Sequence, residues 1–191
     1  MNRRKAVLSI FLGGGAVAGA FGGYKLFRMR RAPDLSYLDH HQSMMADLAE
    51  VIIPRTDTPG AKDAGVGEFV IRLIKDASDR KTQNNFIDGL KDLESYTSDH
   101  YGKRFSDLRM EEQQAIVARS QQKGKPFPGV LGKVEHKFLG KSFFTTLKEA
   151  TVIGYCTSQA GATQLLAYDY IPGGFVGCMP LMPNQKSWAT K

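Results

Sequence analysis

The spacing of the apolar residues is the feature that most constrains the fold of this 191-residue chain. Between residues 38 and 158, apolar side chains recur three and four positions apart, which places them on one face of an α-helix. Three stretches show this pattern: Val66, Phe69, Val70, Leu73, Ile74 and Ala77; Phe86, Leu90, Leu93, Thr97 and Tyr101; and Leu139, Phe143, Leu147, Ala150 and Gly154. Strand-like alternation is scarce. The sequence therefore predicts a mainly α fold, a helical bundle with a single core.

Proline and glycine mark where several of these helices should end. Leu38, Met45, Leu48 and Ile52 form an earlier amphipathic stretch, and Pro54 closes it, since proline lacks the amide hydrogen that a helix interior needs. Residues 55–60 follow, and their last two members, a proline and a glycine, suit a type II turn. Gly102 stands where a long helix should stop. Further helices are predicted over residues 110–122 and 160–168.

The positive charge of the chain is confined to its N-terminus. The formal net charge is +7, and residues 1–31 contain seven basic side chains and no acidic one. Removing those seven from the 26 basic residues of the chain leaves 19, which equals its 19 acidic residues. Residues 32–191 are therefore formally neutral and have no electrostatic footprint for a phosphate backbone. We predict no nucleic-acid partner.

The first 31 residues have the layout of a targeting segment. Arg3 and Arg4 precede residues 6–23, which contain no charged side chain, and further basic residues follow. A basic end before an apolar stretch is typical of an export signal or a membrane anchor. The arginine pair resembles a twin-arginine signal, although the phenylalanine usual in that motif is missing. The alternative is a buried, glycine-rich core helix. We expect two parts: an export or anchor segment over 1–31 and a helical domain over 32–191.

The last part of that domain, residues 169–191, is predicted to be an irregular apolar tail. Proline and glycine recur along it, so neither a long helix nor a strand fits, yet it has no charge between Asp169 and Lys186. An apolar tail is costly to leave in water, so it should lie either on its own bundle or on another protein. For docking to a partner, the candidate anchors are Tyr170, Phe175 and Trp188.

No motif for catalysis or cofactor binding emerges from the sequence. The Gly-Lys-Ser run at residues 140–142 ends like a phosphate-binding loop, but Glu135 stands where such a loop needs glycine. No dinucleotide fingerprint and no haem-attachment motif is found, and the four histidines lack the spacing of zinc ligands. We therefore predict that this chain has no catalytic residue, no cofactor and no metal of its own.

Cys156 and Cys178 are the two cysteines of the chain. In an oxidising compartment they could form a disulfide, which would fasten the tail to the bundle. Closing a loop of about 20 residues would contribute on the order of 3 kcal/mol in the chain-entropy model. Two free thiols, or one bridge to a partner chain, are the alternatives.

Three blocks of the sequence resemble one protein family. The first comprises residues 48–61, LAEVIIPRTDTPGA, and residues 65–69. The second covers residues 143–159, and the closing block comprises residues 168–173 and 177–181. Together these blocks resemble the signature of gluconate 2-dehydrogenase subunit 3.

The resemblance covers about residues 45–185 and implies a small, exported accessory subunit without catalytic residues. Its partner would be a large flavoprotein of the glucose–methanol–choline oxidoreductase type, which holds FAD and oxidises a sugar or sugar acid. A cytochrome c subunit often accepts the electrons. Such a small subunit commonly carries the twin-arginine signal, and the folded flavoprotein is exported with it. The resemblance thus implies a periplasmic protein, held at the inner membrane if residues 1–31 are retained.

Three other functions compete with a stable subunit. The chain could be an escort that leaves the flavoprotein after export and assembly. It could be a membrane-anchored helical protein without a redox partner, in which case no flavoprotein would bind it. A self-contained enzyme is the third, but that would need a cofactor or a clustered acid–base pair, and the sequence offers neither.

Overall fold

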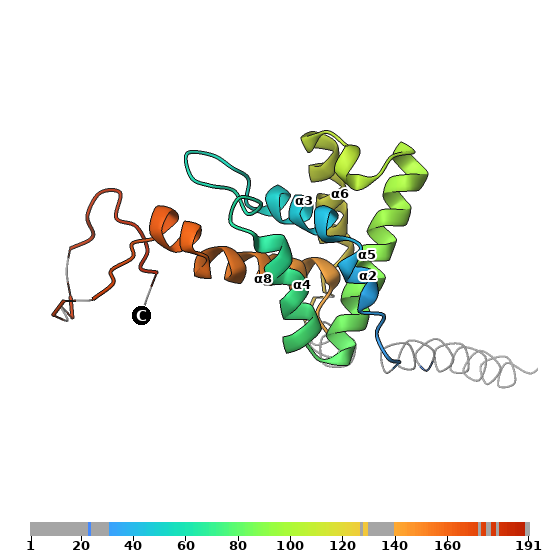
Figure 1. The fold of residues 1–191 in the computed structure, drawn as a ribbon, viewed down its shortest axis with the longest axis horizontal. Coiled ribbons are helices and arrows are strands. Elements are labelled where there is room, and N and C mark those ends of the chain that lie inside the picture. The colour runs from blue at the N-terminus through green and yellow to red at the C-terminus, as the bar shows by residue number, and fades with distance from the viewer. Residues whose placement is uncertain are drawn as a thin grey trace, which may run out of the picture.

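The structure is a computed structural model that describes residues 23, 31–126, 128–129, 140–171, 173–174, 177–178 and 180–189. Its helices are α2 (Ser36–Asp39), α3 (Gln42–Ile52), α4 (Val66–Ala77), α5 (Arg80–Tyr101), the 3₁₀ turn η1 (Phe105–Asp107), α6 (Met110–Lys123), α8 (Phe143–Thr157) and the wide helical turn η2 (Gly161–Leu165) (Figure 1). Strand-like pairing within these residues amounts to one isolated bridge, between Ala167 and Trp188. The prediction of a mainly α fold is confirmed.

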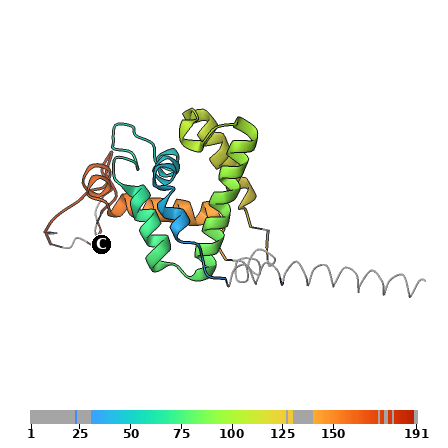
Figure 2. The same ribbon diagram turned by 45° about the vertical axis from the view of Figure 1, so that its right-hand side comes forward.

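Helix α8 lies at the centre of the bundle. It contacts α3, α4, α5 and α6, and it runs across the middle of the molecule in both views (Figures 1 and 2). Its Leu147 and Tyr155 are fully buried, and its Phe143 ring lies 5.0 Å from the ring of Phe86 on α5. Burying one such side chain contributes about 2–3 kcal/mol. The buried apolar side chains form one cluster, to which every element from α2 to α8 contributes.

Most of the predicted helix ends are found where the sequence placed them. Helix α3 ends at Ile52, two residues before Pro54. Helix α5 ends before Gly102, whose φ of 63° is left-handed and whose N–H donates to the Ser98 carbonyl. Helix α6 spans residues 110–123, against the predicted 110–122. A proline or glycine just beyond the helix was sufficient to predict each of these three ends.

Two predicted details are wrong. A type II turn needs a positive φ at its third residue, which would be Gly60. Gly60 is not among the described glycines with a positive φ, so the type II turn that we expected at the end of residues 55–60 is not formed. The helix predicted over 160–168 ends at Leu165, and Leu166 is already extended. The reason is a competing pairing: Ala167 uses its N–H and its carbonyl in hydrogen bonds to the backbone of Ser187 and Ala189.

The chain enters the bundle beside α5. The Arg31 carbonyl accepts a hydrogen bond from the Asn84 side chain (2.9 Å), and the Arg31 guanidinium lies 3.3 Å from the Asp88 carboxylate. Apart from Gly23 and Arg31, the predicted export or anchor segment lies outside the described residues. Along the part that is described, no helix combines the length and the apolarity needed to cross a membrane.

Candidate docking surface

An extended segment leaves the bundle after η2, and we call residues 166–189 the C-terminal arm. The arm projects beyond the end of α8, away from the other helices (red in Figures 1 and 2). Six large apolar side chains on its described part are exposed: Tyr168, Tyr170, Ile171, Leu181, Met182 and Trp188. Tyr170 and Leu181 are 82% and 85% exposed. This is a concentration of apolar surface that monomeric proteins rarely leave in water.

The two ends of the arm are joined to each other. The Ala167 N–H donates to the Ser187 carbonyl (2.8 Å), and the Ala189 N–H donates to the Ala167 carbonyl (2.9 Å). Lys186 adds a bond from its Nζ to the carbonyl of Gln164, in η2 (2.6 Å). The arm is therefore a loop closed at its base, which presents its apolar side chains between two fixed ends.

The predicted docking residues lie at different places along the C-terminal arm. Tyr170 lies on the exposed part of the arm, and Trp188 lies at its base with 59% of its surface exposed. Phe175 lies outside the described residues, as do Arg3 and Arg4 of the predicted export signal.

The structure leaves both cysteines as free thiols. Cys156 is half-buried on α8, whereas Cys178 is exposed within the arm. The disulfide that the sequence allowed is not formed in this structure, in which the arm extends away from the bundle. A bridge between the two cysteines, or from one of them to a partner chain, stays a prediction.

A second projecting segment connects α3 to α4, and we call residues 53–65 the clasped loop. The Glu50 carboxylate holds both of its ends: Oε1 accepts from the Arg55 N–H and Oε2 accepts from the Lys62 N–H, each at 2.8 Å. The Ala61 N–H also donates to the Ile53 carbonyl (2.9 Å). The sequence analysis missed the role of Glu50, whose one local signal is a carboxylate five residues before a turn-rich stretch.

The clasped loop is also fastened to the end of α8. Tyr155 is fully buried, and its hydroxyl donates to the Pro59 carbonyl (2.5 Å). The next residue, Gly60, is buried so closely against Glu50 that a Cβ there would lie 2.3 Å from the carboxylate. A side chain at position 60 would have to displace the Glu50 carboxylate, which holds both ends of the loop, so glycine is favoured here by this close approach and not by the left-handed turn that we predicted.

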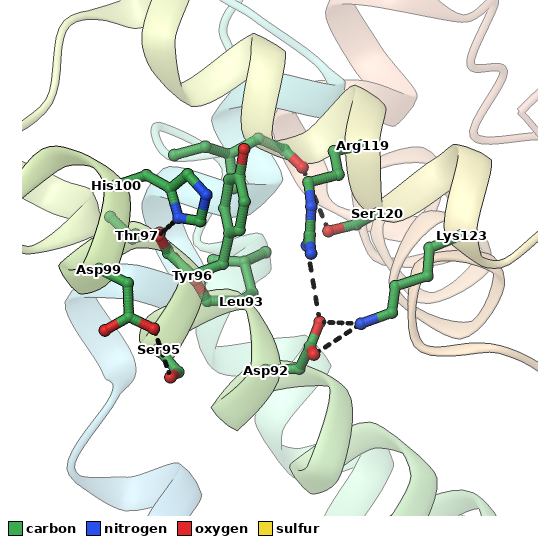
Figure 3. Close-up of polar contacts among 11 residues, drawn as sticks. Asp92, Leu93, Ser95, Tyr96, Thr97, Asp99, His100, Arg119, Ser120 and Lys123 are labelled. Atoms are coloured by element: carbon green, nitrogen blue, oxygen red, sulfur yellow. Dashed lines mark hydrogen bonds and ion pairs between the residues drawn. The ribbon is translucent and has the colours of Figure 1, made fainter.

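Polar side chains join neighbouring helices of the bundle. Between α5 and α6, Asp92 pairs with Lys123 (2.6 Å) and with Arg119 (3.7 Å). The Tyr96 ring lies between the Arg119 guanidinium, 3.7 Å away, and the His100 ring, 3.9 Å away (Figure 3). Such contacts are those of a surface ion-pair and stacking network that holds two helices together.

A groove of about 540 Å³ lies between α4, the start of α5 and α8. Apolar side chains including Leu73 and Ile153 line it, together with the ion pair between Lys141 and Glu149. Asp79, at one end of the groove, accepts the Thr82 N–H as the N-cap of α5. Within the described ranges, no group of three histidine, cysteine or acidic side chains could hold a metal ion.

Comparison with known proteins gives one match. Residues 39–173 match the family described as gluconate 2-dehydrogenase subunit 3. No curated protein and no solved structure matches the chain. The matched range includes the clasped loop, α8 and the first residues of the arm.

Proposed function

The chain belongs to the gluconate 2-dehydrogenase subunit 3 family, and we propose that it is the non-catalytic small subunit of a periplasmic, FAD-dependent dehydrogenase. The family name makes it a subunit of a gluconate 2-dehydrogenase complex. We propose further that the partner is a flavoprotein of the glucose–methanol–choline type, which holds the FAD and oxidises a sugar or sugar acid. A cytochrome c subunit would take the electrons from it.

The exposed apolar arm is the observation that supports this role. Each square ångström of apolar surface removed from water contributes roughly 25 cal/mol, so large side chains such as Tyr170 and Leu181 favour being covered. Tyrosine and tryptophan are frequent anchors at protein interfaces. A small chain that binds only the folded flavoprotein would stabilise that fold by mass action.

We propose that the first 31 residues serve export. Arg3 and Arg4 would address the chain to the twin-arginine route, and the flavoprotein would cross the membrane folded and bound to it. If the segment is retained afterwards, it would hold the complex at the inner membrane. Arg31 contacts α5, and the segment that leads into α2 lies on the opposite side of the molecule from the arm (Figure 1). Flavoprotein and membrane would then lie at different ends of the subunit.

Purification from the native host tests the proposal. The tagged full-length chain, extracted in gentle detergent, should carry an equimolar FAD-bearing dehydrogenase, identified by its flavin absorbance and its mass. Trp188→Ala should weaken that complex about tenfold, as expected for an interface anchor. Met110→Ala is the matched control, since Met110 is an exposed apolar residue of α6.

Each outcome decides between the functions. A colourless, solitary small protein from the envelope fraction would contradict the stable subunit and favour the transient escort. A flavoprotein complex that tolerates Trp188→Ala would remove Trp188 as an anchor and leave the rest of the arm.

A further inference from the structure

We propose that the clasped loop is a second contact with the same flavoprotein, in which the Arg55 guanidinium binds a carboxylate on the flavoprotein surface. This inference rests on the proposed function. It adds to the apolar arm a polar contact that fixes how the partner is oriented.

The first support is the fixed shape of the loop. Its ends are held by the two oxygens of Glu50, and its middle is held by the buried hydroxyl of Tyr155. Residues 54–57, at the first of these two ends, are nevertheless exposed. A loop ordered by its own scaffold loses little conformational freedom when a partner binds. Binding residues are often carried by such loops.

The second support is the state of the two cations of the loop. The Lys62 ammonium lies 2.7 Å from Asp47, whose side chain is 12% exposed, so this cation is engaged within the chain. Arg55, by contrast, is 74% exposed, and its Nε lies 3.6 Å from the half-exposed carboxylate of Asp63. A long ion pair in water contributes little. The planar guanidinium of Arg55 can therefore exchange this contact for a two-pronged bond to a carboxylate of the partner.

The third support is the position of the loop beside the arm. The Tyr155–Pro59 hydrogen bond joins the loop to the last turn of α8, and η2 and the arm follow from the end of that helix. Both views show the loop and the arm projecting on the same side of the bundle (Figures 1 and 2). One partner can therefore touch both. The arm then supplies apolar burial, and Arg55 supplies charge complementarity, which governs orientation and the association rate.

Titration of full-length variants with the purified flavoprotein that co-purifies with the chain tests this contact. We expect Arg55→Glu to raise the dissociation constant at least tenfold, because it sets two carboxylates against each other. Arg55→Gln should raise it less, and its dissociation constant should depend less on salt than that of the unaltered chain. Arg104→Glu is the matched control: Arg104 is an exposed guanidinium paired with Asp107, beyond the far end of α5.

The failures of the two proposals are distinguishable. If the unaltered chain binds the flavoprotein and Arg55→Glu binds equally well, the loop contact is wrong and the subunit function stands. If Arg104→Glu weakens binding as much as Arg55→Glu, binding depends on the overall charge of the chain and not on Arg55, and the loop contact is again wrong. If the unaltered chain binds no flavoprotein, the proposed function itself fails. Melting curves should show the same unfolding temperature for all variants, since both arginines are exposed.

Discussion

At the scale of single residues, Glu94 joins the beginning of the bundle to α5. Its carboxylate accepts a hydrogen bond from the Tyr37 hydroxyl, and the His41 Nε2 lies 3.3 Å from its other oxygen. The rings of Tyr37 and His41 are stacked 4.1 Å apart, and the Lys91 ammonium lies 4.5 Å from the centre of the Tyr37 ring. Burial disfavours the charge on Glu94, but the bonds from Tyr37 and His41 outweigh burial and lower its pKa.

The lowered pKa of Glu94 makes part of the stability dependent on pH. A carboxylate whose pKa is lower in the folded than in the unfolded state stabilises the fold at neutral pH, and this contribution is lost as the pH falls through about 4.5 and below. Because about half of the Glu94 side chain is exposed, solvent screening keeps the effect to about 0.5 kcal/mol. Urea denaturation should show Glu94→Gln less stable than the unaltered chain at pH 7 and equally stable at pH 3. A deficit for Glu94→Gln that stays the same at pH 7 and at pH 3 would contradict this account.

At the scale of elements, the beginning of α5 is set by Asp79. Its carboxylate accepts the Thr82 N–H (2.9 Å), and the hydrogen bonds from Thr82 lower the pKa of Asp79. We expect Asp79→Ala to lower the free energy of unfolding by about 1 kcal/mol, measured by urea denaturation. Asp76→Ala is the control, because Asp76 lies in the last turn of α4, where a negative charge opposes the helix dipole. An equal loss from both variants would mean that Asp79 does not act as a cap.

The helices could be predicted from the sequence because their signals are local. A stripe such as Val66 to Ala77, or a stop such as Gly102, is contained within a few neighbouring residues. The candidate docking surface depends on contacts between distant residues instead. Tyr155 and Pro59 are 96 positions apart, and the arm is closed by a pairing between Ala167 and Trp188. Neither contact has a periodicity, so the sequence predicted an apolar tail and a turn but neither the closed base of the arm nor the clasp on the loop.

At the scale of the whole molecule, the buried core and the exposed apolar side chains of the arm lie in different parts of the chain. The buried apolar side chains of the described residues run from Leu38 to Tyr155, so all of them precede the arm. The large apolar side chains of the arm's described part are exposed. The hydrogen bond from Lys186 to Gln164 of η2 lies near the base of the arm. The bundle should therefore fold without the arm, whereas the partner contact should need it.

Deleting residues 168–191 tests this separation. The shortened chain loses exposed surface and a few hydrogen bonds at the base of the arm, so its unfolding temperature should fall by no more than about 4 °C, the shift expected for about 1 kcal/mol. Its affinity for the flavoprotein should fall far more than that of Trp188→Ala, since every exposed side chain of the arm is removed at once. The unaltered chain, melted and titrated under the same conditions, is the reference. A large loss of thermal stability would show that the arm packs on its own bundle in solution, and its apolar side chains would then need no partner to cover them.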